Sequence, residues 1–123
     1  MNILHITSRK AWIDATRAGR YVAPSLESDG FIHGSTLRQV LPVAEKFYRG
    51  QNGLVLLEID PKRLASEVRW EPPAGEALPG VPPEDTFPHI YGPVNLDAVV
   101  QVLDFEPGPD GAFSLPASLN PGG

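Results

Sequence analysis

The sequence has no cysteine, no long hydrophobic run and no glycine-rich phosphate-binding loop. Without cysteine the chain can form no disulfide, offers no thiol nucleophile and cannot build a zinc site on thiolates. No apolar run approaches the roughly 20 residues that a membrane-spanning helix requires. Neither standard form of the phosphate-binding loop is found, so a nucleotide would have to be held in another way.

Charge and the first residues predict a soluble protein. The net charge of −5 argues against nonspecific binding to nucleic acid or to an anionic membrane. The residues from Met1 to His5 lack the basic region and the apolar stretch of a signal peptide. We therefore expect a cytoplasmic protein with neither a membrane nor a nucleic-acid partner.

The length and the many loop-forming residues predict one domain of short elements. A chain of 123 residues can bury a core as a single domain. Fourteen prolines and twelve glycines predict long ordered loops between the elements. We expect the domain to span residues 1–105, and residues 106–123 to form a Pro/Gly-rich tail that frays.

Two segments have the spacing and the end signals of helices. Over residues 8–18 apolar side chains recur at helical spacing, after two N-cap candidates, Thr7 and Ser8, and before a natural C-cap at Gly19. Over residues 36–49 a hydroxyl at Thr36, followed three residues later by glutamine, fits a capping box. These are the two main helices that the sequence predicts.

Short apolar runs predict the strands, most of which come after the helices. Residues 25–30 are interpreted as a polar turn, and residues 72–86 as a surface loop that packs no core. Helices early and strands late favour an α+β fold with a mainly antiparallel sheet. The predicted strands are 3–6, 54–59, 68–71 and 99–105. Residues 20–23 are expected to be extended, 31–33 form a short apolar stub, and 87–91 form an apolar stretch that Pro88 interrupts.

The three histidines share a local pattern. His5, His33 and His89 each lie in an apolar or aromatic stretch and are each followed within three residues by Ser, Thr or Gly. Strand ends that run into small polar turns are common places for binding sites, although a single such histidine can equally be a hydrogen-bonded core residue. The shared pattern predicts that His5 and His33 line one pocket, with Ser35 at its rim and His89 close by.

Further candidates surround this pocket. Glu58 interrupts the apolar run 54–59, so it needs a partner, a cleft or a solvent-facing sheet edge. The start of the second helix offers free N–H groups, to which Arg38 would add a charge. An anionic or nucleotide-like ligand could bind there beside Thr36, unless this end is merely capped and faces solvent.

Six segments together resemble the DUF952 family of small bacterial proteins, whose function the resemblance does not establish. They occur in the family's order and cover the chain to about residue 105. The segments are His5–Ser8, Ala23–Ser35, Phe47–Gly50, Leu54–Asp60, Val68–Pro72 and Phe87–Leu96.

More distantly, the layout is similar to the catalytic half of the NAD-dependent RNA 2′-phosphotransferases. Leu4–Thr7 resembles their His-Gly-Thr strand, and His33–Ser35 resembles their His-x-Ser strand. The resemblance implies an ADP-ribosyltransferase-like split antiparallel sheet with two main helices. It also implies that His5 hydrogen-bonds NAD near the nicotinamide ribose, and that His33 and Ser35 line the same pocket.

The chain departs from that pattern in several places. Ile6 replaces a glycine that lets NAD approach the backbone. The sequence indicates no tyrosine at the place where many ADP-ribosyltransferases stack one on nicotinamide. It also lacks an assignable basic tetrad for an RNA phosphate and the extra RNA-binding domain.

Three functions stay open at this stage. The first is an NAD-dependent transferase or NAD-binding protein, in which Glu58 or Glu71 would stabilise an oxocarbenium-like ribose. The second is a hydrolase with zinc on histidines, which no close histidine pair supports. The third is a ligand-binding or interaction module without catalysis. The catalytic candidates are His33 and Glu58, no metal ligand is assigned, and the candidates for binding a nucleotide such as NAD are His5, Thr7, Ser35, Thr36, Arg38, His89 and Tyr91.

Overall fold

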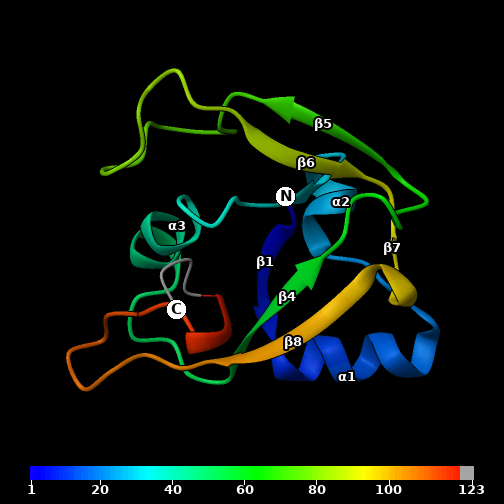
Figure 1. Ribbon diagram of the computed structural model, residues 1–123, viewed down its shortest axis with the longest axis horizontal. Coiled ribbons are helices and arrows are strands. Elements are labelled where there is room, and N and C mark those ends of the chain that lie inside the picture. Colours follow the sequence, from blue (N-terminus) through cyan, green and yellow to red (C-terminus); the bar gives the residue numbers. More distant parts are fainter. Residues whose placement is uncertain (120–123) are drawn as a thin grey trace.

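A computed structural model, which describes residues 1–119, has an α+β fold built on two three-stranded antiparallel sheets (Figure 1). The first sheet has the order β1-β4-β8, with β1 (Ile3–Ser8), β4 (Leu54–Ile59) and β8 (Val99–Phe105). The second has the order β3-β6-β5, with β3 (Ile32–His33), β6 (Phe87–Tyr91) and β5 (Glu67–Glu71). A short antiparallel pair is formed by β2 (Arg20–Tyr21) and β7 (Val94–Asn95). The predicted α+β class with antiparallel pairing is confirmed.

In the described part of the chain, one isolated β-bridge connects the backbones of the two larger sheets. Leu4 and Ser35 exchange two backbone hydrogen bonds of 2.8 Å, after which the strands separate. The neighbouring Gly34 allows this close approach, since a Cβ atom there would lie 2.6 Å from Ile3 Cγ2 and 2.7 Å from the Pro88 carbonyl oxygen. The sheet is therefore split beyond the bridge, and the edge of β1 is left open.

The first helix, α1 (Arg9–Ala18), begins and ends as its sequence predicts. The Ser8 side chain accepts a hydrogen bond from the Ala11 N–H at 3.0 Å, which satisfies a free donor of the first turn. Gly19 closes the helix with a φ of 88°, a left-handed conformation that glycine adopts without strain. Figure 1 places α1 along the first sheet, where its buried Ala15 joins the core.

The second main helix, α3 (Val40–Phe47), is shorter than the predicted helix over 36–49. Its N-cap is Gln39 and not Thr36. The Thr36 carbonyl accepts hydrogen bonds of 3.1 Å from the N–H groups of both Gln39 and Val40, which closes a tight turn before the helix. The Gln39 side chain accepts from the Thr36 N–H at 3.0 Å, as a capping box predicts. It also donates to the Thr86 carbonyl at 2.8 Å, a distant contact that fixes this turn.

One α-helix of the described residues was not predicted. The segment interpreted as a polar turn over 25–30 instead contains α2 (Pro24–Ser28), with Pro24 in the first turn, where its missing N–H costs nothing. Two short 3₁₀ helices, η1 (Leu96–Ala98) and η2 (Ala117–Leu119), lie nearer the C-terminus.

Alternating side chains of the first sheet supply two cores. On one face Ile3 and Leu57 pack with residues of α1 and with Ile90 of the second sheet. On the other face Leu56 and Phe105 pack with α3. The segment after β8 joins this second core, because the Phe113 ring stacks on Phe105 with ring centroids 4.6 Å apart. The prediction of a fraying tail is thus wrong as far as residue 119, and its last part, residues 120–123, lies outside the described residues.

Candidate functional site

A two-lobed cleft lies where the sheet splits. One lobe, of about 300 Å³, is lined mainly by apolar groups, and we call it the apolar lobe. The other, of about 580 Å³, includes Thr7, Tyr21, Ser25, Asp29 and Gln51, and we call it the polar lobe. The lobes form one cleft because they share part of their lining, namely His5, Ile6, His33, Val43, Phe47, Tyr48 and Ala74.

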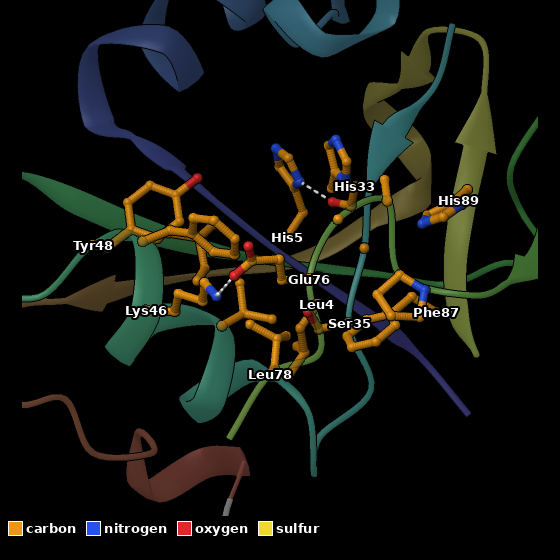
Figure 2. Close-up of a pocket in the computed structure, with 17 residues that line it drawn as sticks. Leu4, His5, His33, Ser35, Lys46, Tyr48, Glu76, Leu78, Phe87 and His89 are labelled. Carbon is orange, nitrogen blue, oxygen red and sulfur yellow. Dashed lines mark hydrogen bonds and ion pairs between the residues drawn. The ribbon is translucent and has the colours of Figure 1, made fainter. Parts of the chain in front are cut away.

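Five parts of the fold supply the walls of the apolar lobe. The edge of β1 forms its floor, the end of β3 and the neighbouring β6 form one side, and the C-terminal half of α3 forms the other. The loop between β5 and β6 closes it with Pro73, Glu76 and Leu78. Figure 2 shows Tyr48 and Lys46 on the α3 side, facing His89 and Phe87 on the β6 side.

His5 is held by hydrogen bonds at both ring nitrogens. Its Nδ1 lies 2.6 Å from the His33 carbonyl oxygen, which can only accept, so Nδ1 carries the proton and donates (Figure 2). Its Nε2 then accepts from the Tyr21 hydroxyl at 2.7 Å, and that hydroxyl is also hydrogen-bonded to Thr7 Oγ1 at 2.9 Å. Burial lowers the pKa of His5 to about 4, so the ring is neutral at pH 7.

His33 stands at the rim of the polar lobe. Its half-exposed ring bonds Asp29 Oδ2 through Nε2 at 2.9 Å. This hydrogen bond holds the pKa of the Asp29 carboxyl below its usual value. The pair therefore places a carboxylate, with a histidine beside it, at the entrance of the cleft.

His89 is buried and is oriented by a carboxylate. Its Nδ1 bonds Glu71 Oε1 at 2.9 Å, and the Tyr91 hydroxyl donates to the same oxygen at 2.5 Å. These two bonds, that of Tyr91 first, lower the pKa of Glu71. Phe31 stacks on the His89 ring with centroids 4.0 Å apart. Within residues 1–119 the remaining nitrogen, Nε2, has no hydrogen-bond partner.

The backbone of Ile6 faces the cleft with its polar groups unpaired. Leu4 exchanges its hydrogen bonds with Ser35, so it makes none with β4. Antiparallel pairing alternates between bonded and non-bonded residues, and the register of β1 with β4 is continuous. The N–H and C=O of Ile6 therefore point away from β4, and Ile6 lines both lobes. No described residue bonds to either group.

Two parts of the cleft were missed by the sequence reasoning. Tyr48 lines both lobes although it was not among the predicted site residues, and burial raises the pKa of its hydroxyl. The loop over 72–86 is not only a surface loop, because Leu78 within it is buried and lines the apolar lobe. The sequence signal for this contact is weak, because Leu78 is the only leucine of a loop that also contains Val81 and several prolines.

The structure brings together most of the predicted site residues. His5, His33, Ser35 and His89 line the apolar lobe, and Thr7 lines the polar lobe. Their functional roles stay proposals, because lining a cleft does not establish what it binds.

Four predicted residues lie outside the cleft. Glu58 accepts a hydrogen bond from Asn2 Nδ2 at 2.9 Å and lies between Leu4 and Gln101 in the sheet, so its partner is structural. Thr36 and Arg38 precede α3, whereas the cleft borders the other end of that helix. The anion site expected at the helix start therefore lies outside this cleft and stays a prediction. Tyr91 bonds Glu71 instead of lining the cleft.

The described residues form neither a cluster of metal ligands nor a helix suited to span a membrane. Within residues 1–119, no three His, Asp or Glu side chains gather as a metal site would require. This arrangement does not favour the zinc hydrolase. Across the same residues, no helix combines the length and apolar character that crossing a membrane demands.

The chain matches one known protein family over most of its length. The profile of the family described as "Protein of unknown function (DUF952)" matches residues 6–102. The chain belongs to the DUF952 family. A search of the curated proteins finds no match.

Solved structures similar to this DUF952 chain come from Caulobacter crescentus. The crystal structure of its protein CC0527 superposes with a TM-score of 0.82 at 32% identity, covering 97% of this chain and 98% of that one. A double mutant of CC0527 gives a TM-score of 0.81 at the same identity and coverage. The solution NMR structure gives 0.71 at 34% identity, covering 90% of each chain. The fold and nearly the whole chain length are thus shared with CC0527.

Proposed function

We propose that the cleft binds a nucleotide that carries a planar amide-bearing ring, with NAD as the leading candidate. The observation that carries the proposal is the unpaired backbone of Ile6, set between the two lobes at the split of the sheet. A strand edge that offers one donor and one acceptor is a binding surface for a group with the complementary pair.

A primary carboxamide is such a group. Its oxygen can accept from the Ile6 N–H while its N–H₂ donates to the Ile6 carbonyl oxygen, as a neighbouring strand would do. A carboxylate of the same shape lacks the donor and would set a negative charge against the carbonyl oxygen. The edge therefore selects nicotinamide over nicotinic acid.

The apolar lobe suits the ring that carries this amide. Phe47 and Tyr48 stand on the α3 side, and Leu78 and Phe87 close the lobe from the loop and β6. Burial of a planar ring among such side chains is favourable, and aromatic pairs add about 0.5–1.5 kcal/mol beyond area burial. The volume of about 300 Å³ is sufficient for a single ring.

The polar lobe suits the sugar of the nucleotide. Thr7, Ser25 and Gln51 offer hydroxyl and amide groups, and the Asp29 carboxylate can accept hydrogen bonds from ribose hydroxyls. Lys46 lies at the cleft, 3.9 Å from the highly exposed Glu76 carboxylate, and it can turn toward a phosphate instead. A ligand that spans both lobes would then place its ring in one and its ribose in the other.

The distant likeness to NAD-dependent RNA 2′-phosphotransferases supports the same ligand. In both, a strand that carries a histidine is followed by a helix and later by a short strand that carries a second histidine. The role of His5 differs from that implied by the likeness, since both of its nitrogens are engaged within the protein. In this proposal His5 positions Tyr21 and β3, and the residue after it, Ile6, contacts the ligand.

The test is a titration of nicotinamide, nicotinic acid and NAD into the ¹⁵N-labelled protein, followed by NMR. Nicotinamide and NAD are expected to shift the Ile6 and Tyr48 amides, and nicotinic acid is expected to bind at least about tenfold more weakly, a difference of about 1.4 kcal/mol. Equal binding of nicotinic acid, or unmoved amides at millimolar nicotinamide and NAD, would contradict the proposal.

A proline variant tests the backbone donor itself. Ile6→Pro removes the N–H that faces the cleft but no bond to β4, so the sheet can form and nicotinamide binding is expected to weaken about tenfold. The matched control is Val102→Pro. Val102 lies opposite Leu57 of β4, and the backbone hydrogen bonds of Leu57 go to β1. The N–H of Val102 therefore points outward from the edge strand β8, away from the cleft. Binding by Val102→Pro is expected to equal that of the wild type.

A further inference from the structure

We propose that the cleft cleaves the bond between ribose and nicotinamide, and that His89 is its general base, positioned by Glu71. This inference rests on the proposed function, since it takes the same ligand as substrate. It adds an activity, hydrolysis of an N-glycosidic bond, and assigns the proton transfer to a residue with no direct role in the binding proposed above.

The dyad of Glu71 and His89 is built by the pairing of β5 with β6. Arg69 lies opposite His89 and Glu71 opposite Phe87, so Glu71 is a diagonal neighbour of His89 on the same face of the sheet. The Glu71 Oε1 atom accepts from His89 Nδ1 at 2.9 Å and from the Tyr91 hydroxyl at 2.5 Å. The carboxylate thus fixes the ring and its tautomer, with the proton on Nδ1 and the lone pair on Nε2.

The free nitrogen of His89 is open to the cleft. The residue is only 3% exposed, it lines the apolar lobe, and Phe31 covers one face of its ring. Among the described residues no fully buried side-chain nitrogen or oxygen lacks a partner. His89 Nε2 has no protein partner, so it must reach accessible space, and the cleft is the space that this residue borders.

The other two histidines do not offer this combination. His5 is bonded at both nitrogens, to the His33 carbonyl oxygen and to Tyr21. His33 stands half-exposed at the rim, where water surrounds it, and its partner Asp29 is half-exposed as well. His89 alone of the three pairs a buried ring and an orienting carboxylate with an unbonded nitrogen.

Hydrolysis of NAD at this bond requires a general base but no general acid. In NAD the ring nitrogen of nicotinamide is already positive, so nicotinamide leaves as a neutral molecule without protonation. As the C1′–N bond breaks, its electron pair passes to the ring nitrogen and a water oxygen forms the new bond to C1′. Because C1′ is bonded directly to the ring in the apolar lobe, which His89 lines, the attacking water stands where the two lobes meet. The water proton passes to His89 Nε2 and then to solvent. The products are nicotinamide, ADP-ribose and one proton, so atoms and charges balance.

The experiment measures nicotinamide release from NAD by chromatography, and NAD binding by NMR, for three variants. His89→Gln is expected to lower the release rate by about 10²-fold or more, as loss of a general base does, with binding retained. Glu71→Gln is expected to lower it less. The control is Glu67→Gln. Glu67 lies on the same face of β5 as Glu71, but its carboxylate bonds Arg69 and not His89. This variant is expected to release nicotinamide at the wild-type rate.

A pH profile separates positioning by Glu71 from a structural role. The anionic carboxylate stabilises protonated His89, so its removal should shift the acid limb of the rate profile of Glu71→Gln toward lower pH. The other titratable or charged groups around His89 are Arg69 on β5, Tyr91 on β6, His33 on β3 and, across the cleft, Lys46 and Glu76. An unshifted limb would contradict the role of Glu71.

The outcomes distinguish this inference from the proposed function. Binding of NAD without nicotinamide release by the wild type overturns the inference and leaves the binding function standing. Release that is unaffected in a folded His89→Gln variant overturns the role of His89. Absence of NAD and nicotinamide binding overturns both.

Discussion

The imidazole Nδ1 of His5 donates a hydrogen bond of 2.6 Å to the backbone carbonyl oxygen of His33. This bond joins β1 to β3 beside the bridge between Leu4 and Ser35, at the point where the two sheets part. The sheets are thereby fixed to each other at one end of the split, while the cleft opens beyond it. Beyond the bridge, β1 and β3 are thus held together by the buried side chain of His5 and not by backbone hydrogen bonds.

The free energy of unfolding should fall in mild acid because of His5. Burial lowers its pKa from 6.5 to about 4 in the folded protein, so between these values the unfolded chain binds more protons. Stability is therefore full above pH 6.5 and is lost as pH falls toward 4, with a loss of about 2 kcal/mol between pH 7 and pH 5. Urea unfolding at the two pH values measures this difference.

The control for this pH effect is His5→Gln, which has no titrating ring at this position. Its free energy of unfolding should be lower than that of the wild type at pH 7 and should change less between pH 7 and pH 5. The pKa values of the Asp29 and Glu71 carboxyls are lowered, so their contributions to the free energy of unfolding change only at more acidic pH. An equal pH dependence in both proteins would show that His5 is not the group responsible.

Removing the Tyr21 hydroxyl should destabilise the fold. Tyr21→Phe leaves the buried Nε2 of His5 without a donor and also removes the bond to Thr7, at an expected cost of about 1–3 kcal/mol. Burial raises the pKa of Tyr21 to about 12, consistent with a hydroxyl held inside the protein. The measurement is denaturant unfolding, with Tyr48→Phe as the matched variant.

Tyr48 suits that comparison because its hydroxyl has no partner within the described residues. Tyr48→Phe should change the free energy of unfolding by less than about 0.5 kcal/mol. If both variants lose the same stability, the bond between Tyr21 and His5 contributes nothing specific.

A methyl group at Gly34 should force the two sheets apart. In Gly34→Ala the new Cβ would stand 2.6 Å from Ile3 Cγ2 and 2.7 Å from a backbone oxygen of Pro88, closer than real contacts allow. Such overpacking is expected to cost about 2 kcal/mol or more. Gly75→Ala is the control, since nothing lies within 4 Å of its added Cβ. Thermal unfolding should separate the two variants clearly, and equal midpoints would contradict the close approach at Gly34.

Elements with local causes were predictable from the sequence. The bounds of β4 follow from an apolar run between Gly53 and Asp60, and α1 follows from the Ser8 cap and from Gly19. These signals act within a few residues, so neighbours in the sequence suffice to decide them. The start of α3 was misplaced because residues 36–39 form a tight turn before the helix, and a bond from Gln39 to Thr86, far along the chain, holds this turn.

The sequence by itself determined the α+β class, the antiparallel strands and the three histidines as candidates, because periodicity and composition record which side chains must be buried. Only the tertiary structure decided what each histidine does. Strand pairing gave His89 the Glu71 carboxylate, and burial gave His5 two partners. It also decided that the cleft lies at the end of α3 and not at its start. Such contacts join residues far apart in the chain, and no local pattern encodes them.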